Sequence, residues 1–289
     1  MDRHWRHGWR HGLRLISAGY SLSVYARTPS KATSLLSVGA TLAASPAELA
    51  ASSDVIFTMI GHPSDVRTLV LDTLVPSLSP NTVIIDHTSS HPALARQIFD
   101  SALEKNCYSI DAPVSGGDLG ARDGKVNYMG SAGKGQSCKI ANQMVVGGSL
   151  VGLSEGLVFA EKAGLDKDKF LEAVRGGAAG SMVMELFGKR MIGRDFRPGG
   201  FAEYMVKDLG MGVDLEEAEE EVMVLPGAAL SKQLFSGMVA NGDGKFGTQG
   251  VITMVKPRFC LLFMLAVHVF DFGFGFDGLL EYVLLVMEY

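Results

Sequence analysis

Short apolar runs alternate with helical patterns along the first part of the chain, and this alternation limits the fold more than any other feature. Residues 21–25, 55–60 and 82–85 have the length and composition of strands, and the last two runs are followed by Gly61 and Asp86. Helical patterns separate or follow them, at residues 30–36, 47–51, 63–71 and 92–105. Uninterrupted apolar strands are typical of parallel sheets that are buried on both faces. The pattern therefore predicts an α/β fold with a doubly wound parallel sheet.

The pattern changes after Gly135, where strand-like runs stop. A long apolar stretch rich in small residues covers residues 136–163, and shorter helical patterns follow at 168–175, 181–191, 202–214 and 226–241. This predicts an all-helical second domain, with Met144, Val145 and Leu150 in its core. We place the sheet domain at residues 1–134, the helical domain at 135–255 and a divergent apolar tail at 256–289.

The tail has no complete membrane span. Residues 259–270 are almost wholly apolar, but Asp271 interrupts them before the length that a bilayer requires. A membrane helix is one interpretation of this tail, and a poorly specified segment is the favoured one. We expect no membrane partner.

Charge and cysteine usage exclude several classes of protein. The net charge is −5 over 289 residues with acids and bases interspersed, which is not the basic surface of a nucleic-acid-binding protein. The acidic run at residues 216–221 is interpreted as a solvated helix face or loop. Cys107, Cys138 and Cys260 lack metal-ligand spacing, so we expect no metal site and a reducing, intracellular compartment. These residues do not separate the cytoplasm from a mitochondrion or chloroplast.

Two neighbouring segments have the residue types of a catalytic site. Residues 111–117 read Asp-Ala-Pro-Val-Ser-Gly-Gly, a turn in which backbone N–H groups and a hydroxyl can approach a small anion. Lys139 follows at the start of the long helical stretch, where burial would make it a proton donor or acceptor. Asn142 is three residues further on, close to one helical turn, so both side chains can face one cleft.

These motifs, in this order, resemble the β-hydroxyacid dehydrogenase family, in particular the plant 3-hydroxyisobutyrate dehydrogenase-like proteins, over residues 17–255. The resemblance implies a Rossmann-type NAD(P)-binding domain followed by a helical dehydrogenase domain. It implies that Ser115, Gly116 and Gly117 bind the carboxylate and hydroxyl of the substrate. It also implies that Lys139 is the general acid and base and that Asn142 orients the substrate.

Cofactor-facing residues follow from the same resemblance. The turn at residues 58–63 and the segment 86–89 match two cofactor loops, and both follow strand ends, where an open parallel sheet binds its ligand. The Lys-Asp pair of the second domain is matched by Lys207 and Asp208, with Lys207 closing over the nicotinamide end. The cofactor-facing residues of these segments are therefore expected to be Met59, Ile60, Gly61, Pro63, Thr88 and Lys207.

Charge after the second expected strand indicates which dinucleotide is bound. An NAD-selective fold usually has an acid there for the ribose 2′-hydroxyl. This chain has Arg27 and Thr28, with Lys31 nearby, and no acid. A cation and a hydroxyl suit a 2′-phosphate, so NADP is favoured and NAD stays as the alternative. The competing interpretation is that Arg27 is only a solvated loop residue.

The sequence departs from the family at three places. The glycine-rich pyrophosphate loop is absent, and residues 4–12 are rich in His, Trp and Arg instead. We hypothesise that residues 2–8 are this loop in the wrong reading frame, because one set of their codons, shifted by one base, encodes Ile-Gly-Thr-Gly-Val-Met-Gly. Gly117 and Lys139 are 22 residues apart, about half of the family spacing, which suggests a lost strand and helix. The third departure is the tail.

The function expected from these observations is that of an oxidoreductase. It would interconvert a small β-hydroxy acid, such as 3-hydroxyisobutyrate, and its semialdehyde or keto form with NAD(P), as a homo-oligomer acting on a small molecule. The alternative is a catalytically impaired or non-catalytic family member that lacks the phosphate loop.

Overall fold

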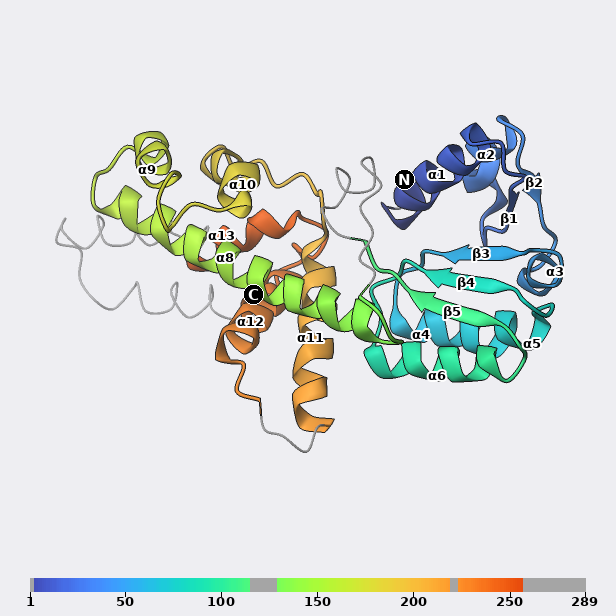
Figure 1. Cartoon of the computed structure of the whole chain (residues 1–289). Coiled ribbons are helices and arrows are strands. Elements are labelled where there is room, and N and C mark those ends of the chain that lie inside the picture. The colour runs from blue at the N-terminus through green and yellow to red at the C-terminus, as the bar shows by residue number, and fades with distance from the viewer. Residues whose placement is uncertain (1–2, 115–128, 219–222, 257–289) are drawn as a thin grey trace, which may run out of the picture.

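The computed structural model of the chain describes residues 3–114, 129–218 and 223–256, which form a sheet half and a helical half (Figure 1). The sheet half comprises residues 3–114. Its elements are α1 (Arg3–Ser17), β1 (Ser23–Val24), η1 (Pro29–Ala32), α2 (Thr33–Leu36), β2 (Thr41–Leu42), α3 (Pro46–Ala51), β3 (Val55–Thr58), α4 (Pro63–Val66), the π-helical stretch η2 (Arg67–Leu74), α5 (Val75–Ser77), β4 (Val83–Asp86), α6 (Pro92–Leu103) and β5 (Tyr108–Asp111).

All strand pairs within the described residues are parallel. β3, β4 and β5 form one sheet in that order, and β1 pairs with β2 in a second sheet. The register places Thr58 opposite Asp86 and Asp86 opposite Asp111. Three polar side chains therefore lie in one row at the carboxyl edge of the sheet. The prediction of an α/β fold with a parallel sheet is confirmed, and the strand predicted at residues 82–85 begins one residue later.

Helices cover one face of the three-stranded sheet. In Figure 1, α4, α5 and α6 lie together on one side of β3, β4 and β5. Ile56 and Ile84 point into that layer and are buried in a core that also contains Val70 and Ile98. On β3 the burial alternates, and Phe57 is 41 % exposed. The opposite face of this sheet is thus less completely covered than parallel sheets usually are.

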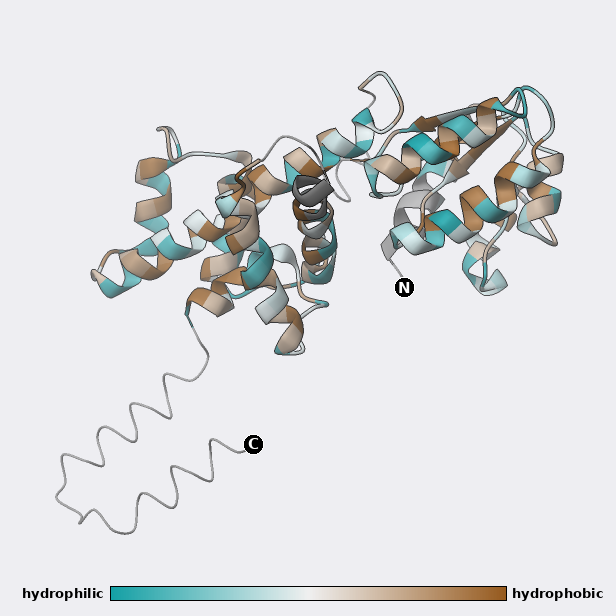
Figure 2. Cartoon of the chain, turned by 90° about the horizontal axis from the view of Figure 1, so that it is seen from below, coloured by the Kyte–Doolittle hydropathy of each residue, from teal (hydrophilic) through white to brown (hydrophobic). Residues whose placement is uncertain are grey.

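The helical half comprises residues 129–256. Its elements are α8 (Lys134–Lys162), α9 (Lys167–Val174), α10 (Met182–Ile192), α11 (Ala202–Ala218), α12 (Pro226–Ala240), η3 (Thr248–Val251) and α13 (Ile252–Val255). Their order and extents follow the predicted helices, because the chain marks the helix starts with capping residues. Asp166 and Ser181 accept backbone N–H groups at the first turns of α9 and α10. Figure 2 shows that these helices have both hydrophobic and hydrophilic residues.

The 29-residue helix α8 joins the two halves. It begins beside α6 and β5 and runs to the far end of the helical half, beside α9 (Figure 1). By length and composition it could span a bilayer. Leu150, Leu153 and Leu157 nevertheless lie in the core of the helical half, where they pack with residues such as Phe235 and Met205. As predicted, Leu150 belongs to this core and Met144 packs against it, whereas Val145 is exposed, which corrects the prediction for that residue.

The first helix is a finding that the sequence did not predict. Residues 3–17 form the continuous helix α1. They stand at the place where the family has its glycine-rich loop, which this sequence lacks. Ser115, Gly116 and Gly117, the expected substrate-binding residues, lie outside the described residues. So does the tail after Lys256.

Candidate active site

Two loops meet at the carboxyl edge of the sheet. The loop after β3 includes Ile60, whose backbone N–H donates to the hydroxyl of Thr88 in the loop after β4, at 3.0 Å. Parallel strands bring the loops together because both strands end at the same edge. Met59, Ile60 and Gly61 lie in the loop after β3, Pro63 begins α4 directly after it, and Thr88 lies in the loop after β4. The structure thus brings these five predicted residues into one region.

A buried carboxyl group fixes the geometry of these loops. Asp86 Oδ1 accepts the Thr58 hydroxyl at 2.7 Å and the Thr88 backbone N–H at 3.0 Å. Burial raises the pKa of Asp86 above the usual aspartate value, and the two threonine hydrogen bonds only partly oppose this effect. Next to it, the His87 ring lies between the rings of His11 and Phe57, with centroid distances of 5.0 and 5.8 Å. Burial lowers the pKa of His11, and the His87 ring adds to this effect.

A polar joint connects the sheet to α8. The Asp111 carboxylate, at the end of β5, accepts the backbone N–H groups of Gly133 and Gln136, each at 2.8 Å. The Gln136 side chain is fully buried, and it accepts the Ser90 N–H and donates to the Thr88 carbonyl. A carboxylate at a helix N-terminus satisfies free N–H groups and interacts favourably with the helix dipole. The joint therefore fixes α8, and the side chains on its first turns, relative to the loop after β4.

Three polar side chains follow the joint on α8. Lys139 Nζ donates to Gln143 Oε1 at 3.3 Å, and Asn142 Nδ2 donates to the same oxygen at 3.0 Å. Lys139 and Gln143 are four residues apart, so they lie on one face of the helix. The structure thus places the two predicted residues, Lys139 and Asn142, around a third that sequence reasoning missed.

α11 supplies the opposite side of this cluster. Gln143 Nε2 donates to Asp208 Oδ2 at 2.9 Å, and Asp208 Oδ1 lies 3.2 Å from Lys207 Nζ. Lys207 also donates to the Ser89 carbonyl at 2.8 Å and to the Gly61 carbonyl at 3.4 Å. We call Lys139, Gln143, Asp208 and Lys207 the polar chain. It runs from α8 through α11 to the loops after β3 and β4.

Close helix packing makes the polar chain possible. A Cβ atom on Gly212 of α11 would lie 2.3 Å from Met144 Cε and 2.9 Å from Ile140 Cγ2 of α8. A larger residue at this position would have to displace the Met144 and Ile140 side chains, so the glycine favours the close approach of the two helices. The approach brings Gln143 within reach of Asp208 and also of the Met205 sulfur, at 3.1 Å.

Sequence reasoning found part of this site. Lys207 lies against the loops after β3 and β4. Arg27 and Thr28 are exposed in the segment after β1, and Lys31 is part of η1. Gln143 and Gln136 were missed as site residues, and Asp208 was named only as the neighbour of Lys207 in the Lys-Asp pair. For Gln143 the available signal was its spacing of four from Lys139, which matches a helical turn more closely than the spacing of Asn142.

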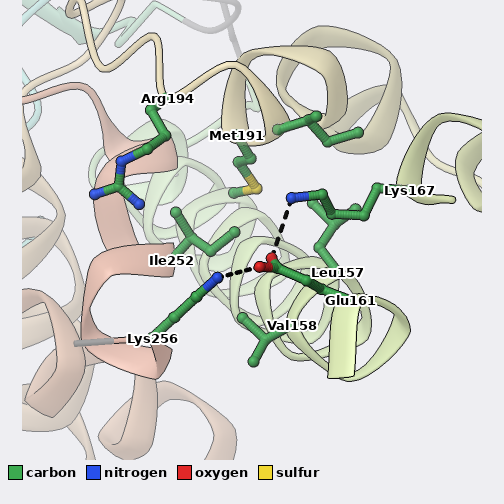
Figure 3. A pocket seen from close by; sticks show the side chains of 9 residues that line it. Leu157, Val158, Glu161, Lys167, Met191, Arg194, Ile252 and Lys256 are labelled. Atoms are coloured by element: carbon green, nitrogen blue, oxygen red, sulfur yellow. Dashed lines mark hydrogen bonds and ion pairs between the residues drawn. The ribbon is translucent and has the colours of Figure 1, made fainter. Parts of the chain in front are cut away.

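A separate pocket of about 260 Å³ lies at the far end of α8 (Figure 3). Leu157, Met191 and Ile252 form part of its lining. Glu161 accepts hydrogen bonds from both Lys167 and Lys256, as the dashed lines show. The lysines lower the pKa of Glu161. These three ionic groups pair with one another, and Arg194 also lines the pocket.

The sheet edge has polar groups that suit one end of a dinucleotide. Ser90 Oγ is buried and has no hydrogen-bond partner in the described part of the chain, and Lys207 lies against both loops. These polar groups fit the nicotinamide end of such a cofactor. At the pyrophosphate end, α1 takes the place of a glycine loop, and N–H groups inside a helix bond to its own carbonyls. No group of three or more His, Cys, Asp or Glu side chains that could hold a metal ion occurs among residues 3–114, 129–218 and 223–256.

Comparisons with protein families assign both halves. Residues 8–148 match the family model described as the NAD-binding domain of 6-phosphogluconate dehydrogenase. Residues 133–255 match the one described as the NAD-binding domain of NADP-dependent 3-hydroxyisobutyrate dehydrogenase. The two matches overlap at the start of α8.

Relatives match over most of their length. The chain is 52 % identical over 268 positions to the Arabidopsis thaliana protein named probable 3-hydroxyisobutyrate dehydrogenase-like 3, mitochondrial, covering 84 % of this chain and 82 % of the relative. It is 31 % identical to 2-hydroxy-3-oxopropionate reductase of Escherichia coli, covering 84 % and 92 %. The alignment to the Arabidopsis protein has more positions than 84 % of this chain supplies, so this chain has gaps relative to it.

Solved structures share the fold. The 3-hydroxyisobutyrate dehydrogenase of Mycobacterium tuberculosis, determined with L-serine, superposes with a TM-score of 0.79 at 23 % identity, over 87 % of this chain and 96 % of that one. A structure described as Psf3 in complex with NADP+ and 2-OPP gives 0.76 at 19 % identity, over 87 % and 97 %. With the identity to the plant relatives, the chain belongs to the 3-hydroxyisobutyrate dehydrogenase-like branch of the β-hydroxyacid dehydrogenases, which are NAD(P)-dependent oxidoreductases.

Proposed function

We propose that the protein interconverts a small 3-hydroxy acid and its semialdehyde or keto form with NADP(H), and that Lys139 transfers the proton. The polar chain is the observation that supports this most directly. It connects Lys139 on α8 to Lys207, whose ammonium contacts the Ser89 and Gly61 carbonyls of both cofactor-facing loops. The proton-transfer group is therefore held next to the edge at which the cofactor would bind.

The side chains have different chemical roles in the proposed reaction. The dinucleotide supplies or accepts the hydride when it is bound. In the reducing direction Lys139 donates a proton to the substrate oxygen, and in the oxidising direction it accepts that proton. Asn142 orients the substrate, and Ser115, Gly116 and Gly117 bind its carboxylate. Lys207 and Thr88 hold the nicotinamide end of the cofactor.

The cofactor and substrate follow from charge and from the relatives. Arg27, Thr28 and Lys31 favour the 2′-phosphate of NADP over the 2′-hydroxyl of NAD. Relatives named for 3-hydroxyisobutyrate and for 2-hydroxy-3-oxopropionate support a short substrate with a carboxylate. Glyoxylate and succinic semialdehyde belong to the same size class. The mitochondrial names of the plant relatives support an organellar location, and the family supports a homo-oligomer. The domain division at residues 134 and 255 remains part of this proposal.

A second candidate function follows from α1. A helix in place of the glycine loop removes backbone N–H donors that would otherwise hold the pyrophosphate. A protein with this N-terminus would be a catalytically impaired or non-catalytic member of the family. Its substrate motif would then serve for binding only.

Cofactor titration and turnover separate the two candidates. NADPH binding is measured by fluorescence, and turnover is measured with a panel of short hydroxy acids and aldehydes. Lys139→Ala should lower kcat by about 10²–10⁴-fold and leave NADPH affinity nearly unchanged, as expected for a lost general acid. Lys134→Ala is the matched control, because Lys134 is exposed on the same helix. Absence of NADPH binding at millimolar concentration would favour the second candidate, and normal turnover of Lys139→Ala would exclude this lysine as the proton-transfer group.

A further inference from the structure

We propose that Gln143 is a positioning residue that holds the Lys139 ammonium and makes its protonation depend on Asp208 of α11. The proposal deepens the proposed function and rests on it for the catalytic meaning of Lys139. Among the described residues, the Gln143 side chain forms its hydrogen bonds with Lys139, Asn142, Met205 and Asp208 and not with the cofactor-facing loops. It acts through the two residues that it joins.

The chemistry of its neighbours fixes the orientation of the Gln143 amide. A lysine ammonium can only donate hydrogen bonds, and an ionised carboxylate can only accept them. The amide oxygen must therefore face Lys139, at 3.3 Å, and the amide nitrogen must face Asp208, at 2.9 Å. Turning the amide over would place a donor against the ammonium and an acceptor against the carboxylate, so both bonds would be lost. Asn142 reinforces the same orientation by donating to the oxygen.

Asp208 connects the Gln143 amide to the edge of the sheet at which the cofactor would bind. It is only 4 % exposed; its Oδ2 accepts the Gln143 amide, and its Oδ1, which has no hydrogen bond in the described part of the chain, lies 3.2 Å from the Lys207 ammonium as an ion pair. Lys207 in turn contacts the Ser89 and Gly61 carbonyls. A displacement of α11 relative to these loops would move Asp208. Because Gln143 is bonded to both residues, the position of the Lys139 ammonium would then change as well. Asp208 therefore connects Lys139, through the Gln143 amide, to the lysine that contacts the loops.

The length of the side chain matters for this role. Gln143 reaches from α8 to α11 while its oxygen stays beside Lys139 of its own helix. An asparagine is one methylene shorter and can keep only one of the two contacts without a backbone shift. A glutamate has the same length, accepts from Lys139, but cannot donate to Asp208. The three substitutions Gln143→Leu, Gln143→Glu and Gln143→Asn therefore separate the two bonds.

The pH dependence of Lys139 acylation tests the proposal without turnover. The full chain is treated with a limiting amine-reactive ester from neutral to alkaline pH, and modification of Lys139 is quantified by peptide mass spectrometry. Only the neutral amine reacts, so the midpoint reports its protonation. Gln143→Leu should lower the midpoint by about one pH unit, because an acceptor that stabilises the ammonium is lost. Gln143→Glu should raise it by a similar amount, because a carboxylate replaces the amide.

A double-mutant comparison tests the dependence on Asp208. Asp208→Asn should shift the Lys139 midpoint in the wild-type background and shift it much less when combined with Gln143→Leu. Gln233→Leu is the control, because Gln233 is exposed on α12 and should leave the midpoint unchanged. Circular dichroism confirms the folding of each variant. Gln143→Ala replaces Gln143→Leu if the latter does not fold, because alanine also removes the acceptor beside Lys139, and the same direction of shift is expected.

Two outcomes would overturn the proposal. One is that neither Gln143→Leu nor Gln143→Glu moves the midpoint, and the other is that Asp208→Asn has equal effects with and without Gln143. A midpoint that shifts as expected in a protein without turnover would uphold the positioning role while rejecting the proposed function. In an active protein, the pH profile of kcat should shift in the same direction as the acylation midpoint.

Discussion

The Asp111 carboxylate accepts the backbone N–H of Gln136 at 2.8 Å, and this bond connects the last described strand of the sheet to the first turn of α8. The other Asp111 oxygen accepts the Gly133 N–H at the same distance. Both bonds have an anion as acceptor and are buried, so they belong to the stronger class of hydrogen bonds. The orientation of α8, and with it the position of Lys139, depends on them.

Asp111→Asn should destabilise the protein by about 1–3 kcal/mol. An asparagine retains one acceptor oxygen, and its NH₂ group would face an N–H donor of α8. The free energy of unfolding is measured with urea, and Asp100→Asn on the exposed side of α6 is the control. Equal stability of the two variants would show that Asp111 does not hold the helix.

Gly135→Ala should disturb the same joint. The added Cβ would lie 2.2 Å from the Asp111 carbonyl oxygen, a distance at which the backbone must move. We expect a loss of about 1–3 kcal/mol, typical of overpacking. Gly148→Ala on the same helix meets no atom within 4 Å and should instead gain about 0.5–1 kcal/mol through helix propensity. We expect the two substitutions to change the free energy of unfolding, measured with urea, in opposite directions. A change in the same direction for both would contradict this prediction.

Replacement by threonine should have different effects at two neighbouring positions of β3. Ile56 is 3 % exposed in the sheet core, whereas Phe57 is 41 % exposed on the other face. Ile56→Thr should cost at least about 2 kcal/mol, because it leaves a cavity and buries a hydroxyl. Phe57→Thr should stay within about 1 kcal/mol and should reduce binding of the dye ANS by the native protein. Unchanged dye binding would mean that this face is covered in solution.

Asp86 should make stability depend on pH. Burial raises its pKa in the folded state, so the folded protein holds this proton more tightly than the unfolded chain does. The stability from this group is complete below the aspartate pKa of the unfolded chain, about 3.9, and is lost as pH rises through the folded-state pKa. Asn at this position cannot ionise and can still accept from Thr58 and Thr88. Urea titrations at a series of pH values give the free energy of unfolding of Asp86→Asn and of the wild type. The value for the variant minus the value for the wild type should therefore increase as the pH rises above about 4. A difference that stays constant with pH would refute this prediction.

Arg27→Asp tests cofactor choice. The variant replaces a cation that could pair with the 2′-phosphate by an anion that repels it, so NADPH affinity should fall more than NADH affinity. Binding of both cofactors is measured by fluorescence titration, and each protein serves as its own control through the ratio of the two dissociation constants. Equal losses for both cofactors would show that Arg27 does not contact the 2′-phosphate.

The sequence predicted the order of elements because local rules specify it. Apolar runs that end at Gly61 and Asp86 were predicted as buried strands, and the structure has β3 and β4 there. Capping residues such as Ser181 mark helix starts. Lys139, Asn142 and Lys207 could be predicted as site residues because they fall in recognisable motifs.

The roles of Gln143, Gln136 and Asp208 could not be predicted, because each role depends on at least one partner that is 46 to 65 residues away along the chain. Whether a glutamine is solvated or bridges two charged groups depends on which helix packs against it. That packing is set by side-chain volume at a contact such as Gly212 against Met144, which no periodic pattern reveals. The sequence thus determined the elements through local spacing and capping, and its motifs indicated the groups that we propose to react. Tertiary structure decided how these groups are joined, because the contacts form only when distant segments pack.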